Sequence, residues 1–181
     1  MVAKNVPIPS LGFDTSENLS AAHYDYLVSA GFKWGCRYVP LAGQSSTANG
    51  VIQPAELANA LARKLGMMFV QFARTSPITA AQGAADGKAA ATYVLQTLKA
   101  PNTTCLWCDM GLATRDATIA YVNAWYQGTI DAGMSPAAAG VYFEPGVPLT
   151  SSERFSLINL HRYWSTARDH ARGNTSRSPA S

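Results

Sequence analysis

The sequence has little charge and no long apolar run, and both absences exclude whole classes of protein. Asp, Glu, Lys and Arg make up only 14% of its 181 residues, so no strongly charged surface is expected over most of the chain. No run of about 18 apolar residues occurs, which argues against a transmembrane helix. The N-terminus holds Lys4, two prolines and no apolar core, unlike a signal peptide. The compartment stays open between the cytoplasm and export by another route.

Cysteine and histidine are also scarce, with three residues of each. Cys105 and Cys108 have the spacing of a redox or zinc pair, but the second pair that such a zinc site needs is missing. They also fall in an apolar run that is typical of a strand, where residues three apart point to opposite faces. We therefore expect buried, reduced thiols. The histidines show no metal-ligand spacing, and phosphate-binding and dinucleotide motifs are absent, so no metal or cofactor is expected.

Positive charge is concentrated at the end of the chain. The net charge of +3 arises wholly after Thr150, because acidic and basic residues balance before it. Residues 171–181 are predicted to form a basic, flexible tail after a single domain at 1–170. The alternative is that this tail binds nucleic acid or an anionic cell-wall polymer. We favour the flexible tail, so no nucleic-acid partner is expected.

A unit of amphipathic helix, glycine and apolar strand recurs about every 30 residues, the length of a βαβ unit. Because the apolar runs are continuous, the strands are expected to form a parallel sheet that is covered on both faces. We predict an α/β protein of the TIM-barrel type, short and incomplete, since five or six strands are fewer than eight. An open doubly wound sheet is the alternative. The expected helices span 20–31, 54–66, 80–98 and 114–132, and the expected strands 8–14, 32–39, 67–72, 104–109 and 139–143.

The last segment allows two interpretations. Thr150 and Glu153 form a capping box that starts a helix. That helix either continues through His170, or it ends early and residues 160–166 form a sixth strand. We favour the short helix followed by a strand.

Three apolar runs deliver an acidic residue at or near their carboxyl ends: Asp14, Asp109 and Glu144. In a parallel barrel these strand ends meet on one face. Glycoside hydrolysis commonly needs two carboxyl groups, so the three residues are candidate catalytic groups. Each has a simpler explanation as well. Asp14 could cap a turn, Asp109 could organise a loop, and Glu144 could belong to an exposed turn.

Aromatic and planar polar residues lie near the same strand ends. The aromatic rings could form the walls of a carbohydrate cleft, while a guanidinium or amide could bind hydroxyl or carboxylate groups. Core packing is the alternative for each ring, and an ion pair with Asp14 or Asp109 is the alternative for Arg37. The candidate substrate-binding residues are Phe13, Arg37, Gln71, Tyr142 and Trp164, with Tyr38 and Phe72 as further wall residues.

Short motifs occur in a fixed order along about residues 11–165: Gly12–Thr15, Gly31–Phe32, Cys36–Tyr38, Glu56, Ala84–Ala91, Trp107–Asp109 and Gly140–Tyr142. In their order and spacing they resemble the glycoside-hydrolase-like domains of unknown function that are related to the family 25 muramidases. The resemblance implies a TIM-type barrel, a peptidoglycan-type cell-wall polysaccharide as substrate, and no metal.

One departure from the muramidases bears on activity. In those enzymes the first strand ends in an aspartate, which Asp14 matches, and the fourth ends in Asp-x-Glu, whose glutamate is the proton donor. Here the fourth strand continues Asp109-Met110-Gly111, so the donor is replaced by glycine. The resemblance thus implies either a glycoside hydrolase that uses another acid or an inactive carbohydrate-binding or envelope-associated module.

Overall fold

The computed structural model describes residues 10–75, 78–110, 115–143, 156–157, 160 and 162–165. Its strands form one parallel sheet in the order β1-β2-β3-β4-β5-β6, so each strand lies beside the next one in the chain. A doubly wound sheet would instead reverse its order at one point. The strands are β1 (Leu11–Thr15), β2 (Phe32–Val39), β3 (Gly66–Gln71), β4 (Leu106–Asp109), β5 (Ala139–Phe143) and β6 (Tyr163–Ser165).

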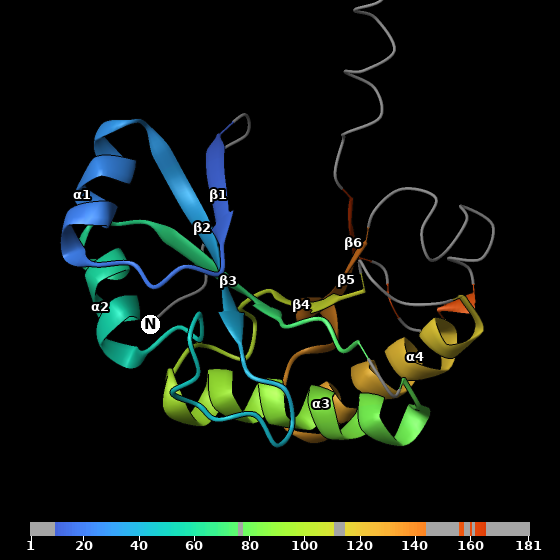
Figure 1. Ribbon diagram of the computed structural model, residues 1–181. Helices are drawn as coiled ribbons and strands as arrows, with labels where there is room; N and C mark the ends of the chain where they lie inside the picture. Colours follow the sequence, from blue (N-terminus) through green and yellow to red (C-terminus); the bar gives the residue numbers. More distant parts are fainter. Residues whose placement is uncertain are drawn as a thin grey trace, which may run out of the picture.

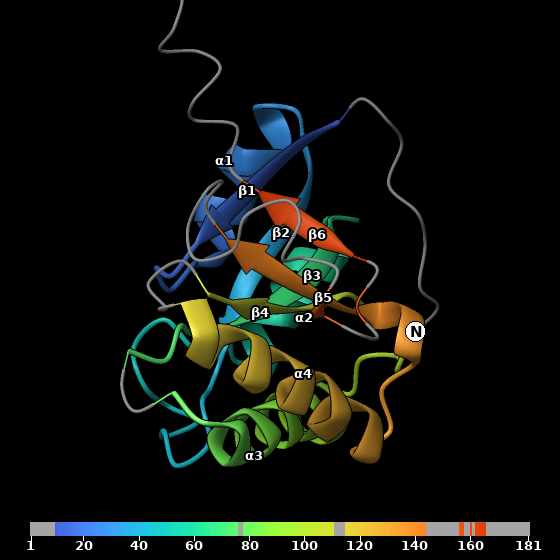
Figure 2. The same ribbon diagram turned by 90° about the vertical axis from the view of Figure 1, so that its right-hand side faces the viewer.

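The sheet is curled into a half-barrel (Figure 2). The ring centroids of Trp34 on β2 and Trp164 on β6 lie 6.3 Å apart, although three strands separate β2 from β6. Neighbouring strands are spaced by about 4.8 Å, so these rings could not meet across a flat sheet. The predicted α/β class and parallel sheet are confirmed, and the completeness of the barrel stays a prediction.

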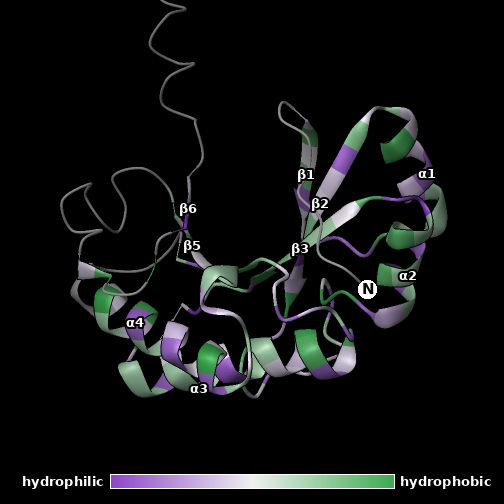
Figure 3. Ribbon diagram, turned by 180° about the vertical axis from the view of Figure 1, so that it is seen from behind, coloured by the Kyte–Doolittle hydropathy of each residue, from purple (hydrophilic) through white to green (hydrophobic). Residues whose placement is uncertain are grey.

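The helices cover the convex side of the sheet (Figure 1). One pair packs against the first strands, and the other two helices lie side by side beneath the rest of the sheet. All of them carry both hydrophobic and hydrophilic residues along their length (Figure 3), as helices with one buried side do. They are α1 (Ala21–Ser29), α2 (Pro54–Ala62), α3 (Ala80–Thr92), which continues as the π-helix η1 (Tyr93–Thr97), and α4 (Arg115–Asp131), with a short 3₁₀ turn η2 (Pro136–Ala138) before β5. No helix of the described part has the length and hydropathy to cross a membrane.

Caps define both ends of α1, whereas the end of α2 differs from the prediction. The Ser20 hydroxyl accepts a hydrogen bond from the His23 amide at the start of α1, and Gly31 follows its end with φ of +91°. The prediction that Gly66 ends the second helix is wrong. Lys64 takes the left-handed conformation after α2, with φ of +62°, and Gly66 is the first residue of β3.

The C-terminal part of the chain confirms the strand of the favoured interpretation. Residues Tyr163–Ser165 form the sixth strand, parallel to β5. The capping box at Thr150 and Glu153 lies outside the described residues, as does the tail at 171–181. The domain boundaries therefore stay predictions.

The thiols of Cys36 and Cys108 are buried and free, which confirms the prediction for Cys108. Burial is the main cause that raises the pKa of both thiols well above its usual range. Cys105 is also free, but the prediction that it is buried is wrong, because its side chain is only half-buried. Its Sγ lies 2.9 Å from Nη1 of Arg162.

Candidate functional site

The concave face of the half-barrel carries two of the predicted carboxylates near its carboxyl-end rim. Asp109 of β4 aligns with Tyr142 of β5, which in turn aligns with Trp164 of β6. Asp14 of β1 aligns with Cys36 of β2, which lies two residues beyond Trp34. Aligned residues of parallel strands point to the same side, and residues two apart do so as well. Because Trp34 and Trp164 meet on the concave side, both aspartates belong to that side.

The two carboxylates act on each other electrostatically. Partial burial and then the Asp109 charge raise the pKa of the Asp14 carboxyl, and Arg37 opposes this shift. The pKa of Tyr38 is raised by burial and then by Asp14 and Asp109, so this tyrosine shares the same neighbourhood. A carboxyl group with a raised pKa keeps its proton to higher pH, which is the property of a general acid.

Tryptophan rings fill the concave face below this rim. The ring centroids of Trp107 and Trp164 lie 5.7 Å apart, and Trp164 also contacts Trp34. Glycines on the neighbouring strands make room for the rings. A Cβ atom on Gly12 would lie 1.9 Å from Cε2 of Trp34, and one on Gly140 would lie 2.4 Å from Cζ3 of Trp107. The rings form a floor, so a ligand on this face would lie at the rim.

Further aromatic side chains lie at the rim itself. The rings of Tyr38 and Phe72 lie 4.6 Å apart at a tilt of 36°, and both side chains are half-buried. Tyr142 contacts Trp164 at 5.0 Å between ring centroids. Such rings offer flat apolar surfaces next to the carboxylates, as the walls of a sugar site do.

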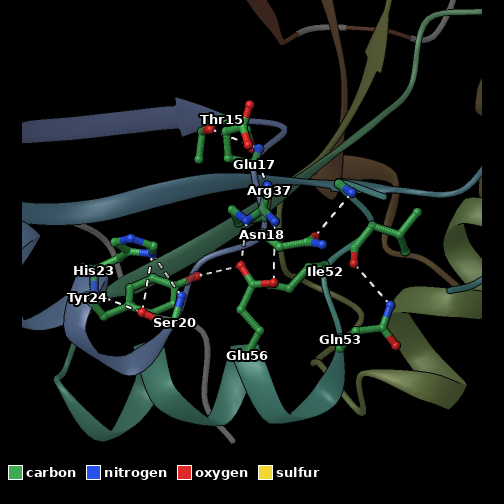
Figure 4. Close-up of polar contacts among 12 residues, drawn as sticks. Thr15, Glu17, Asn18, Ser20, His23, Tyr24, Arg37, Ile52, Gln53 and Glu56 are labelled. Carbon is green, nitrogen blue, oxygen red and sulfur yellow. Dashed lines mark hydrogen bonds and ion pairs between the residues drawn. The ribbon is translucent and has the colours of Figure 1, made fainter. Parts of the chain in front are cut away.

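The structure does not bring Phe13 and Arg37 to the concave face. Phe13 lies between rings of the convex side, 6.2 Å from that of Tyr24 on α1. Arg37 is fully buried and pairs with Glu56 of α2, with Nε to Oε1 at 2.7 Å (Figure 4). The Tyr24 hydroxyl donates to the same Oε1 at 3.0 Å. The guanidinium is thus held by Glu56 rather than by the predicted Asp14 or Asp109.

Gln71 also lies on the convex side of the sheet and is fully buried. Its Oε1 accepts a hydrogen bond from Nε1 of Trp125 on α4, and its Nε2 has no hydrogen-bond partner among the described residues. Glu144, the third candidate acid, follows β5 directly but lies outside the described residues. The rim therefore brings together Asp14, Asp109 and Tyr142, with Trp164 in the floor beside them.

Sequence reasoning did not find the buried polar network around Asp86 on α3. Asp86 is fully buried and accepts hydrogen bonds from Nε of Arg74 at 2.5 Å and from the Tyr121 hydroxyl at 2.6 Å. The Ala42 amide donates to it at 2.9 Å. Ala42 follows β2 and Arg74 follows β3, so Asp86 fastens both loops next to the rim. The available signal was a lone acid among the small residues of Ala84–Ala91, where Lys88 is the only other charged residue.

The raised pKa of Asp14 predicts how its replacement changes stability. An Asp whose pKa is higher in the folded than in the unfolded chain lowers stability as pH rises from the usual 3.8 through the folded pKa. Asp14→Asn is therefore expected to raise the melting temperature at pH 7. This gain should disappear when thermal unfolding is measured below pH 3.8, where Asp14 is protonated in both states. A variant less stable than the wild type at pH 7 would contradict the assignment.

Comparisons with known proteins show the fold. No protein-family model matches the sequence, and no curated protein matches it either. The Tat-secreted protein Rv2525c of Mycobacterium tuberculosis, crystallised with HEPES, is 12% identical over 85% of this chain and 76% of that chain, with a TM-score of 0.59. The same protein crystallised with L-tartrate is 13% identical over 84% of this chain and 75% of that chain, with a TM-score of 0.59. An uncharacterized protein of B. stearothermophilus is 14% identical over 85% of this chain and 73% of that chain, with a TM-score of 0.60.

A muramidase of Trichobolus zukalii is also similar, at 15% identity over 74% of this chain and 65% of that chain. Its TM-score of 0.46 is too low to carry an argument. At these identities the mycobacterial and Bacillus proteins establish a shared fold and no activity.

Proposed function

We propose that this protein is a glycoside-hydrolase-like protein that acts on bacterial cell-wall polysaccharide at the concave rim. The observation that supports it most is the electrostatic coupling of Asp14 and Asp109 beside Tyr38. A carboxyl group whose pKa is raised beside a second carboxylate is the pattern of an acid and its charged partner. The resemblance to the muramidase-related domains supplies the substrate class.

In the proposed mechanism Asp14 holds the proton. Its raised pKa lets it donate to the glycosidic oxygen as the bond breaks, while the Asp109 carboxylate stabilises the positive sugar ring or activates water. Tyr38 and Tyr142 lie beside the carboxylates and would position the sugar. Glu144 is the alternative acid, because it follows β5 directly in the sequence.

A second function, glycan binding without cleavage, is favoured by one observation. The residue two beyond Asp109 is Gly111, where the muramidases carry their proton donor. The same rim would then bind a polysaccharide without hydrolysing it. Because the fold is shared with a Tat-secreted protein, an envelope location is part of both proposals.

Incubation with purified peptidoglycan and with N-acetylglucosamine oligomers tests the proposal. Asp14→Asn and Asp109→Asn are each expected to lower the release of reducing ends roughly a hundredfold or more, as loss of an acid or base does. The same measurement on Glu144→Gln decides whether Asp14 or Glu144 is the proton donor. Asp25→Asn, a change at an exposed carboxylate on α1, is the control and should leave the rate unchanged.

The pH profile gives a second criterion. The Asp109 charge helps to raise the pKa of Asp14. The residual activity of Asp109→Asn should therefore begin to fall with rising pH at a lower pH than the activity of the wild type does. Saturable binding without product that both rim variants abolish would establish the second function. Equal product release by all variants, or no binding and no product, would reject the rim as a glycan site.

A further inference from the structure

The amino-end edge of the sheet has an unusual set of turn residues. Four residues in the left-handed conformation are each the second residue after a helix, on the way to the next strand: Gly31, Lys64, Lys99 and Gly133, with φ of +91°, +62°, +54° and +103°. Glycine adopts this conformation without strain, whereas a residue with a Cβ atom does so at a cost. Two of the four equivalent turns nevertheless carry lysine. Retained backbone strain is a reason to look for a function.

Further exposed cations lie at the same end. Lys33 is the second residue of β2, and Arg162 directly precedes β6, so both lie where strands begin. No ion pair involves Lys33, Lys64, Lys99 or Arg162 within the described residues. Among the described residues, the acidic side chains at this end are Asp25, which Arg63 neutralises, and Asp131, which the Gln127 amide binds. The described residues of this end therefore carry a positive excess.

The exposed large apolar side chains gather there as well. In the described part of the chain these are Leu11, Tyr26, Val28 and Tyr163, at 58%, 71%, 36% and 39% exposure. Leu11 and Tyr163 are the first residues of β1 and β6, and Tyr26 and Val28 lie in the second half of α1. All strands of the parallel sheet run the same way, as β1, β5 and β6 show in Figure 2. The start of each strand therefore belongs to one end of the molecule.

The opposite end has the reverse character. The carboxylates of Asp14, Glu17 and Asp109 lie at or just beyond the carboxyl ends of β1 and β4. The molecule thus has a cationic, partly apolar end and an acidic rim. A negatively charged surface would attract the cationic end and repel the acidic rim. This fixes the orientation of the protein on such a surface.

We propose that the amino-end face, formed by Leu11, Lys33, Lys64, Lys99, Arg162 and Tyr163, docks on an anionic lipid bilayer. Basic side chains near such a surface gain from its negative potential, and exposed apolar or aromatic side chains enter the headgroup region. A soluble polyanion would use the cations but not the apolar side chains. In the docked orientation the rim of Asp14 and Asp109 faces away from the bilayer. The inference does not depend on the rim's chemistry.

Vesicle sedimentation with the full chain tests this surface. The protein is expected to bind vesicles of phosphatidylcholine mixed with phosphatidylglycerol, to bind pure phosphatidylcholine poorly, and to be released by salt. Lys64→Gly and Lys99→Gly should each weaken binding about fivefold, and together about 25-fold, from the usual contribution of a basic residue near an anionic membrane. Neither change should lower the melting temperature, because glycine suits the left-handed turn.

Two further variants make the test selective. Lys88→Gln removes one charge from the outer side of α3, away from the strand starts, and should change vesicle affinity less than about twofold. Leu11→Ser should weaken vesicle binding but leave binding to heparin, a soluble polyanion, unchanged. Equal losses for Lys88→Gln and Lys64→Gly, or no binding to anionic vesicles, would overturn the proposal. So would tight heparin binding with no effect of Leu11→Ser on vesicles.

Discussion

Replacing Asp86 by asparagine is expected to lower the free energy of unfolding by about 3 kcal/mol or more, as removal of one partner from a buried ion pair does. Asp86 is fully buried and its two oxygens accept from both Nε and Nη2 of Arg74, at 2.5 and 2.8 Å. The Tyr121 hydroxyl and the Ala42 amide donate to the same carboxylate. An amide offers only one acceptor atom, so donors would face its NH₂ group and the guanidinium would lose its counter-charge. Urea unfolding followed by circular dichroism measures the loss.

Asp25→Asn is the matched control. Arg63 binds Asp25 through Nε and Nη2 at 2.6 and 2.9 Å, the same two-pronged geometry as at Asp86. The Asp25 side chain is 65% exposed, however, so water replaces the lost contact and little or no change in stability is expected. Equal losses in the two variants would show that geometry rather than burial determines the contribution of these pairs.

The order of elements could be predicted from sequence because local signals agree with the fold. Ser20 caps α1, Pro54 begins α2, and β2 spans the predicted residues 32–39. Repetition of helix and strand implied a parallel sheet, since consecutive parallel strands need a crossover of this length. The end of α2 was missed because a left-handed turn was expected to use glycine, and the chain uses Lys64 instead.

The face of each strand residue could not be predicted, and this explains the misplaced binding residues. In Phe32–Val39 both faces of the strand are covered, so apolar and polar residues do not alternate. Nothing in the run shows that Cys36 shares a side with Asp14 whereas Arg37 points to α2. The register between strands supplies that information, and register is a property of the folded sheet.

The acids of the site were easier to find than their relation to each other. Asp14 and Asp109 both stand out as the first carboxylates after an apolar run. Their coupling requires β1 and β4 to face each other, which depends on the curl of the sheet. That curl rests on the meeting of Trp34 with Trp164 from distant parts of the sequence. Large rings opposite glycines are a signal that can be read only once the strands are paired.

The close packing of α3 on α4 depends on glycine residues, although helix propensity alone would favour alanine at the same positions. A Cβ atom on Gly87 would lie 2.1 Å from the backbone oxygen of Trp125, and one on Gly83 would lie 2.2 Å from that of Tyr121. On α4, a Cβ atom on Gly128 would lie 2.3 Å from the backbone oxygen of Ala84. These contacts are with backbone atoms, which cannot rotate away. The two helices must therefore separate to admit a methyl group at any of the three positions.

Gly87→Ala is accordingly expected to destabilise the protein by about 2 kcal/mol, within the range of about 1–3 kcal/mol that is usual for an overpacked interior. Propensity alone predicts the opposite, because alanine favours a helix interior by about 1 kcal/mol over glycine. Ala85→Gly, at an exposed position of the same helix, isolates that propensity and should cost about 1 kcal/mol. Thermal and urea unfolding of both variants separate the two effects.

A Gly87→Ala protein more stable than the wild type would mean that α3 and α4 are not held together at Gly87. Loss of stability in both variants, with the larger loss at Gly87, would show that the helix pair beneath the sheet is fixed by backbone contact.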